Sequence, residues 1–238
     1  MSLMIEYESL GRLNKSFEDE YMQCFRELLN SGWYILGKQV VSFEDAFAQY
    51  CGVKHCIGVA SGLDALMLAL RSYDFPKGSE VLVPSNTYIA TILSILQCDL
   101  KPVLVEPDIH TYNIDPLNIE EKITKNTCAI MVVHLYGKAC DMGSIMGIAD
   151  KYALPVIEDC AQAHGALYEG RKVGSLGVMG CFSFYPGKNL FCFGEGGSVT
   201  SDNESYIDTI NVLKNQGSRE RYHHERVGYN MRLEGVNG

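Results

Sequence analysis

Apolar positions at the start of the chain follow helical spacing. They predict a first helix over residues 17 to 30, which ends at Ser31-Gly32. The aromatic turn from Gly32 to Gly37 follows, and a second helix is predicted over 42 to 50. A short apolar run over 55 to 60 then predicts the first strand.

From residue 61 onward, helical and strand-like segments alternate. Helices are predicted over 61–70, 89–97, 116–123, 142–152 and 203–215, and strands over 80–84, 101–105, 127–133 and 154–158. This alternation predicts an α/β domain built around a mostly parallel sheet with helices on both faces. The polar residues 216–226 are expected to form a loop or extension.

Ligands in such sheets bind at the carboxyl ends of the strands. The residues that follow the predicted strands here are Ser61, the segment Ser85 to Tyr88, His134 and Asp159. We therefore expect these side chains to meet along one edge of the sheet. His134 and Asp159 carry ionisable groups, which makes this edge the first place to look for chemistry.

Composition and charge exclude several classes of protein. The 238 residues carry a net charge of −9 with no Lys/Arg-rich run, so nucleic acid is not expected as a partner. The nine cysteines include no C-x-x-C pair, which favours buried free thiols in a reducing cytoplasm over zinc or disulfides. No apolar run is long enough to span a membrane, and no signal-peptide pattern begins the chain.

Three short segments carry candidate chemistry. Lys188 lies among aromatic residues between two turns, where a lysine can serve as a Schiff-base nucleophile, although most lysines beside turns are solvated. Asp159 closes a buried strand and needs a cationic partner. Ser61-Gly62 opens a helix directly after a strand, which either forms a phosphate cradle or simply caps a core helix.

Other phosphate-binding signatures do not fit. The run from Gly194 to Gly197 lacks the spacing of a dinucleotide fingerprint, and the Walker A pattern fails because Asn189 stands where Ser or Thr would coordinate magnesium. One cofactor does need a lysine, a carboxylate, a helix mouth and an aromatic ring together, namely pyridoxal phosphate (PLP). No metal site is predicted.

Seven motifs, in order along the chain, carry a resemblance to a known family. They are Ser31 to Gly37, Ser61 to Leu66, Pro84 to Thr91, Val133 to Gly137, Glu158 to Gln162, Ser183 to Lys188 with Gly194 to Gly197, and Gly228 to Leu233. The chain resembles the DegT/DnrJ/EryC1/StrS sugar aminotransferases, from Leu10 to its last residue. The resemblance implies the fold of the aspartate aminotransferases, PLP fold type I.

The resemblance also assigns roles to catalytic and ring-binding residues. Lys188 would hold PLP through a Schiff base and move the proton between the cofactor carbon and the substrate carbon. Asp159 would keep the pyridine nitrogen protonated, so that the ring acts as an electron sink. Tyr88 would stack on one face of the ring, and Gln162 would lie against the other.

The phosphate and the partner subunit are assigned in the same way. Ser183, the segment Ser61-Gly62 and the backbone of Leu63 would bind the phosphate, and Leu63 stands where relatives often have threonine. In similar enzymes an asparagine matching Asn230 reaches the phosphate of the neighbouring subunit. The resemblance therefore implies a homodimer with shared active sites.

The subgroup that the chain resembles aminates C3 of nucleotide-linked 3-keto-6-deoxyhexoses, typically on a dTDP carrier with L-glutamate as the amino donor. Tyr34 and Tyr185 would then lie near the sugar, and Arg219 or Tyr222 could approach the nucleotide. For each of these four residues a plain packing or surface role is an equally good interpretation. Amination at C4 by a member of the same family is the alternative reaction.

Two further functional hypotheses remain open: a non-catalytic PLP-binding regulatory protein with the same fold, and a plain nucleotide-binding α/β module. The presence of Lys188 favours the enzyme. Residues 1–238 are expected to form the PLP-binding large domain, with an N-terminal arm over about residues 1–30. Because relatives continue beyond the motif that holds Gly238, the resemblance implies a smaller C-terminal subdomain outside this chain.

Overall fold

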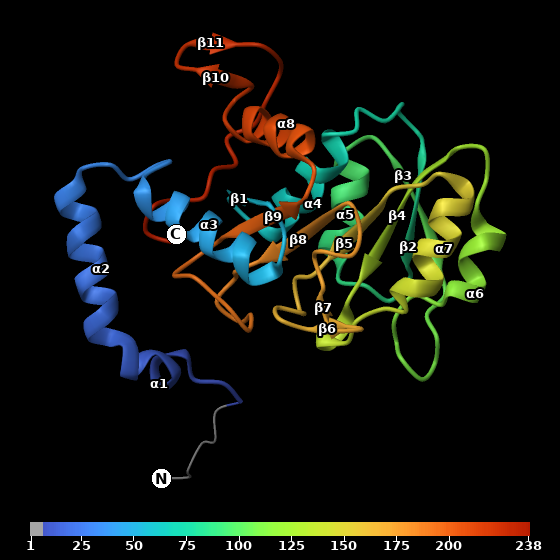
Figure 1. The fold of residues 1–238 in the computed structure, drawn as a ribbon, viewed down its shortest axis with the longest axis horizontal. Helices are drawn as coiled ribbons and strands as arrows, with labels where there is room; N and C mark the ends of the chain where they lie inside the picture. The colour runs from blue at the N-terminus through green and yellow to red at the C-terminus, as the bar shows by residue number, and fades with distance from the viewer. Residues whose placement is uncertain (1–6) are drawn as a thin grey trace.

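The computed structural model describes residues 7–238. A central sheet has helices on both faces, and the first helices of the chain, in dark blue, lie beyond one end of it (Figure 1). This arrangement confirms the predicted α/β class with a mostly parallel, mixed sheet. Within residues 7–238, helices that combine the length and the hydropathy needed to cross a membrane are absent.

The central sheet contains β1 (His55–Val59), β2 (Glu80–Pro84), β3 (Lys101–Val105), β4 (Thr127–Val133), β5 (Val156–Asp159), β8 (Met179–Ser183) and β9 (Gly197–Ser201). Their order across the sheet is β1-β9-β8-β5-β4-β2-β3. Strand β9 pairs antiparallel with both β1 and β8, whereas all the other pairs are parallel. The carboxyl ends of the six strands other than β9 therefore meet at one edge.

The helices that cover the sheet begin close to their predicted starts. They are α3 (Lys38–Cys51), α4 (Gly62–Arg71), α5 (Ile89–Gln97), α6 (Pro116–Ile119), α7 (Met142–Tyr152) and α8 (Glu204–Lys214), with the short 3₁₀ helices η2 (Glu120–Lys122) and η3 (Leu135–Gly137). The exception is α3, which begins before the predicted residue 42. The hydroxyl of Ser61 caps α4 by accepting the N–H of Asp64 at 3.1 Å.

Successive side chains of the strands point to opposite faces of the sheet, and both faces are buried. Val81, Val83 and Met131 point to one side, where they join the apolar residues of α4 and α8 in one core cluster. Leu82 and Ile130 point to the other side, where they pack with residues of α6 and α7. Strands buried on both faces are typical of parallel sheets, which is why their sequences are almost continuously apolar.

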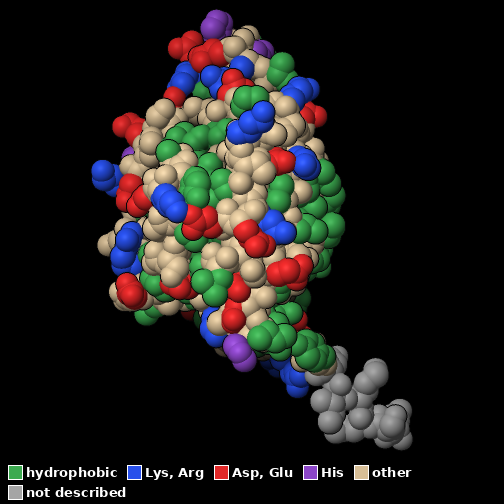
Figure 2. Space-filling view, turned by 90° about the vertical axis from the view of Figure 1, so that its right-hand side faces the viewer, with side chains coloured by type: hydrophobic (Ala, Val, Ile, Leu, Met, Phe, Trp, Pro, Cys, Tyr) green, Lys and Arg blue, Asp and Glu red, His purple; other side chains and the backbone are tan. Residues whose placement is uncertain are grey.

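The N-terminal arm consists of α1 (Leu10–Asn14), η1 (Lys15–Phe17) and α2 (Glu18–Ser31), and residues 1–6 of the predicted arm lie outside the described residues. Leu28 is the one buried residue of α2. Large apolar side chains of the arm are exposed, among them Leu13, Phe17, Met22, Phe25 and Leu29. Figure 2 shows hydrophobic side chains on the surface where the described chain begins.

Three parts of the fold were not predicted from the sequence. Strands β8 and β9 are rich in Gly, Ser and Thr rather than in large β-branched residues. Two of their buried hydroxyls bond locally: Thr200 donates to Gly174 O and Ser201 to Val178 O, both at 2.7 Å. The expectation of a loop over 216–226 was wrong in part, because β10 (Ser218–Glu220) and β11 (His223–His224) form a hairpin. A second small hairpin joins β6 (Leu167–Tyr168) to β7 (Arg171–Lys172).

Candidate active site

A cleft of about 910 Å³ lies at the edge where the parallel strands end. Nine of the residues singled out in the sequence line it: Ser61, Gly62, Leu63, Tyr88, Asp159, Gln162, Ser183, Tyr185 and Lys188. They come from the ends of β5 and β8, from the start of α4 after β1, and from the segments that follow β2, β5 and β8. The sheet therefore brings together residues that are far apart in the sequence, as the parallel arrangement predicts.

One end of this cleft is formed by the first turn of α4 and the end of β8. A Cβ atom on Gly62 would lie 2.5 Å from the Cβ of Ser183, so only glycine allows the helix mouth to approach this strand so closely. Gly197 is constrained in the same way, because a Cβ there would lie 2.4 Å from Ser61 O. Both glycines are needed for the contact that puts the Ser183 hydroxyl beside the start of α4.

The start of α4 also supplies backbone donors. The first N–H groups of a helix have no partner within the helix. Here the Asp64 N–H is taken by the Ser61 hydroxyl and the Ala65 N–H by Ser61 O, which leaves those of Gly62 and Leu63 for a ligand. Together with the positive end of the helix dipole, these donors form a cradle suited to a phosphate group.

Asp159 is the buried anion of the cleft, with 6% of its surface exposed. Its Oδ2 accepts a hydrogen bond from the Thr91 hydroxyl at 2.8 Å, and its Oδ1 accepts one from the Ala161 N–H at 3.1 Å. Burial raises the pKa of Asp159 above its ordinary value, and these two donors and Lys188 oppose that rise. A buried carboxylate held in this way can receive a proton donor from the cleft.

Lys188 lies in the turn that follows β8. Its backbone N–H donates to Tyr185 O at 2.8 Å, which closes the turn, and its half-buried side chain lines the cleft. Tyr185 is half exposed at the same cleft. The site therefore brings together the Lys188 amine, the buried Asp159 carboxylate and the anion cradle at the start of α4, which come from separate segments of the chain.

Tyr88 and Gln162 lie on the two segments that border Asp159. Tyr88 occupies the N-cap position of α5 without a side-chain capping bond, and it is 69% exposed, so its ring is available to a ligand. The Gln162 Oε1 accepts the Tyr136 N–H at 2.8 Å, which leaves the Gln162 amide NH₂ as a donor. Tyr136 adopts a left-handed φ of 55°, a conformation that is uncommon for a non-glycine residue.

Four residues singled out in the sequence do not line this cleft: Tyr34, Arg219, Tyr222 and Asn230. Arg219 instead pairs with Asp208 and Glu225 beside the β10–β11 hairpin. Asn230 accepts a hydrogen bond from Arg232 through its Oδ1. Within this one chain, their predicted roles toward the sugar, the nucleotide or a neighbouring phosphate stay predictions.

Two threonines of the site were not singled out in the sequence. Thr87 lines the cleft, and Thr91 contacts Asp159 from below it. Both lie within the motif Pro84 to Thr91, and their hydroxyl oxygens are 2.7 Å apart. Thr87 precedes Tyr88, the N-cap residue of α5, so helical spacing did not predict this contact.

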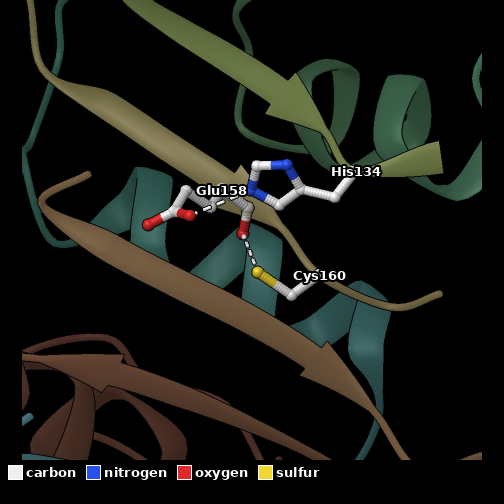
Figure 3. Close-up of side chains that lie close together, drawn as sticks. All are labelled: His134, Glu158 and Cys160. Atoms are coloured by element: carbon white, nitrogen blue, oxygen red, sulfur yellow. Dashed lines mark hydrogen bonds and ion pairs between the residues drawn. The ribbon is translucent and has the colours of Figure 1, made fainter. Parts of the chain in front are cut away.

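A buried group next to the cleft has the composition of a metal site but is fully hydrogen-bonded. His134, Glu158 and Cys160 lie together at the ends of β4 and β5 (Figure 3). The Cys140 N–H donates to His134 Nδ1 at 3.1 Å, so Nε2 carries the ring proton and donates to Glu158 Oε2 at 2.9 Å. Both ring nitrogens of His134 are therefore engaged by hydrogen bonds within the protein.

The Glu158 carboxylate accepts three further bonds from a single loop, donated by the N–H groups of Gly174, Leu176 and Gly177 at 2.7 to 2.8 Å. Burial alone would raise the pKa of Glu158, but the donors, with His134 the strongest, outweigh burial and lower it. Glu158 thus ties the loop before β8 to the end of β4, next to Asp159.

Replacing Glu158 by glutamine is expected to destabilise the protein by about 3 kcal/mol or more, because one end of the amide would face two N–H donors. Urea unfolding measures this, with exposed Glu169→Gln as the control. Because the folded pKa is lowered, the stabilisation is present above the ordinary pKa of 4.5 and is lost as pH falls through the lowered value. The difference in free energy of unfolding between the parent protein and Glu158→Gln should therefore become smaller in acid. A difference that is equal at all pH values would contradict this account.

Comparison with known proteins identifies the family. The family model described as "DegT/DnrJ/EryC1/StrS aminotransferase family" matches residues 15–237. A curated relative from Aneurinibacillus thermoaerophilus, dTDP-3-amino-3,6-dideoxy-alpha-D-galactopyranose transaminase, is 58% identical over 97% of this chain and 64% of its own length. The matched region therefore includes every residue assigned to the cleft.

Solved structures agree with this result. The structure of S. venezuelae DesV in complex with a ketimine intermediate matches with a TM-score of 0.97 at 42% identity, over 99% of this chain and 64% of that one. NtdA from Bacillus subtilis with bound cofactor PMP matches with a TM-score of 0.91 at 30% identity, over 100% of this chain and 55% of that one. This chain thus spans less than two thirds of each of these proteins. It belongs to the DegT/DnrJ/EryC1/StrS aminotransferase family, as its motifs predict.

Proposed function

We propose that this protein binds PLP in the cleft and transfers an amino group from L-glutamate to C3 of a dTDP-linked 3-keto-6-deoxyhexose. The observation that carries the proposal is the meeting of Asp159, Lys188 and the α4 mouth in one cleft. These three features match the ring nitrogen, the aldehyde and the phosphate of PLP. The glycine-dependent contact between Gly62 and Ser183 supports the phosphate end.

The side chains have complementary roles in this proposal. PLP, when bound, supplies an electron sink that allows a proton to leave the carbon bearing the amino group. Lys188 holds the cofactor and then carries that proton as general base and acid, for which its place at the cleft wall is suited. Asp159 keeps a proton on the ring nitrogen, because a buried carboxylate favours a cationic neighbour.

The remaining contacts orient the ring and the phosphate. Tyr88 and Gln162 would cover the two faces of the ring. The hydroxyls of Ser61 and Ser183 and the N–H groups of Gly62 and Leu63 surround the phosphate position; the Ser61 hydroxyl already accepts from Asp64, so its own proton is free to be donated. This division leaves the exposed side of the cleft, beside Tyr185, for the substrate.

The choice of substrate rests on the relatives. The A. thermoaerophilus relative is named for a 3-amino sugar on a dTDP carrier, and the identity to it is 58% over nearly the whole of this chain. This supports amination at C3 over the alternative at C4. Tyr185 is the predicted sugar-binding residue that the cleft includes, so it is our candidate for a direct contact with the sugar.

A homodimer is proposed for the working enzyme. The α1–α2 arm exposes Leu13, Phe17 and Phe25 while burying little of itself, which is typical of a surface that a partner covers. Asn230, which lies outside this chain's cleft, would then serve the site of the partner. Light scattering should give the mass of two chains.

The free cysteines fit a protein of the reducing cytoplasm.

The function is tested with purified protein, PLP and the two substrates. Added PLP is expected to give a visible absorbance band, which L-glutamate removes while 2-oxoglutarate appears. Product NMR with the dTDP-linked keto sugar then identifies the aminated carbon. A protein that stays colourless with PLP would contradict the proposal, whereas nitrogen at C4 would favour the alternative reaction.

A further inference from the structure

Two threonine hydroxyls connect the cleft to the buried Asp159 carboxyl. Thr91, on the first turn of α5, is 1% exposed, and its Oγ1 lies 2.8 Å from Asp159 Oδ2. The Thr87 Oγ1 lies 2.7 Å from the Thr91 Oγ1, and Thr87 lines the cleft. The three groups therefore form a continuous chain from the cleft wall to the floor.

The chemistry of the end group fixes the direction of this chain. An ionised carboxylate only accepts hydrogen bonds, so Thr91 must donate its single hydroxyl proton to Asp159. The Thr91 oxygen is then an acceptor toward its other neighbour, and Thr87 must be the donor in the 2.7 Å contact. Donation from Thr87 increases the polarity of the Thr91 hydroxyl and strengthens its bond to Asp159.

We propose that Thr91, supported by Thr87, is a positioning residue that holds the Asp159 carboxylate in its ionised form and in one orientation. The role of that carboxylate toward the cofactor rests on the proposed function. The hydrogen-bonded chain itself does not, because it is formed by this chain's own residues.

Few other groups near Asp159 could hold its carboxylate ionised and in one orientation. The Ala161 N–H binds Oδ1, so Thr91 is the side-chain hydroxyl that fixes Oδ2. The ionisable side chains that act on the Asp159 carboxyl are Lys188, beyond β8, and His134, at the end of β4. With one donor on each oxygen, the carboxylate cannot rotate without losing both bonds, yet it keeps lone pairs free for a proton donor in the cleft.

The same bond ties α5 to β5. Thr91 is three residues after Tyr88, whose carbonyl accepts the Thr91 N–H at 3.1 Å. Fixing Thr91 against Asp159 therefore also fixes the start of the helix that carries Tyr88. The carboxylate and the aromatic ring proposed to cover the cofactor are positioned by one contact.

The first test uses the protein without cofactor. Thr91→Val removes the hydroxyl at nearly constant shape, and Thr91→Ser retains it. Ser94→Ala is the matched control, because Ser94 is a fully buried hydroxyl on the same helix that donates to Thr91 O and does not touch Asp159. The titration of the Asp159 carboxyl is followed by ¹³C NMR and assigned with Asp159→Asn.

Loss of a donor to the ionised form should raise the pKa of Asp159. In Thr91→Val the rise is expected to be about one pH unit or more, whereas Thr91→Ser and Ser94→Ala should match the parent protein. Thr87→Val should give a smaller rise, and it remains a test if Thr91→Val does not fold. An unchanged titration in both valine variants would overturn the inference.

The second test measures PLP affinity by absorbance titration. Thr91→Val is expected to weaken PLP binding about 10-fold or more, and Thr91→Ser to restore it. In the Asp159→Asn background the valine substitution should have little further effect, because its action passes through the carboxylate. An equal loss in both backgrounds would indicate a merely structural role. A parent protein that binds no PLP would refute the proposed function while leaving the NMR result valid.

Discussion

Replacement of Lys188 by alanine is expected to lower transamination by at least about 1,000-fold, the upper range for loss of a positioned general acid and base. Lys188 is the lysine that lines the cleft, so within residues 7–238 no other amine is in place to take over its role. The variant should also lose the absorbance band of the Schiff base between PLP and the lysine, while the phosphate cradle and Asp159 remain. Activity assays and absorbance spectra measure these two effects separately.

The control for this variant is Lys138→Ala, which removes an exposed lysine near the same edge of the sheet. It should retain both activity and absorbance. Borohydride reduction of the PLP-treated protein, followed by peptide mass analysis, should add the cofactor to the peptide that contains Lys188. A label on any other lysine, or full activity in Lys188→Ala, would refute the assigned role.

The sequence predicted the fold well where burial controls the pattern. Strands β2 and β4 were located to the residue because they are buried on both faces of the sheet, which requires apolar side chains along most of their length. The edge strand β3 is partly exposed, and its short apolar run after Lys101 marks it in the sequence. Strands β8 and β9 escaped prediction because their close approach to Gly174 and Ser61 requires glycine and small hydroxyl residues instead. Tertiary packing, rather than intrinsic strand preference, determines those two elements.

Some residues of the candidate site could be predicted from the sequence, and others could not. Lys188, Asp159 and Ser61 each carry a chemical signature and lie next to a turn or a strand end, so the sequence alone drew attention to them. Thr91 carries no such signature, and its importance depends on a contact with a residue 68 positions away. The orientation of Gln162 by a backbone N–H was equally invisible in the sequence, because it depends on the left-handed turn at Tyr136.

Asp159→Asn is expected to reduce transamination about 100- to 1,000-fold, the range seen when one preorganised electrostatic group is removed from a catalytic site. Asparagine has the size of aspartate but no charge, so it cannot keep a proton on the ring nitrogen. The Thr91 hydroxyl and the Ala161 N–H would both still face the side chain. At a PLP concentration that saturates the variant, the loss should therefore fall on kcat, and an unchanged kcat would refute the role of Asp159.

The stability of the Asp159→Asn variant is not expected to fall with its activity. Burial raises the pKa of Asp159 above its ordinary value of 3.8, so the stabilisation from its protonated form is present below that value and is lost as pH rises through the raised one. The asparagine side chain of the Asp159→Asn variant does not ionise and escapes this loss. At neutral pH, urea unfolding of the cofactor-free variant should therefore show stability equal to or above that of the parent, with exposed Asp74→Asn as the control. A clear loss of stability would mean that the carboxylate is held for the fold rather than for its chemistry in the cleft.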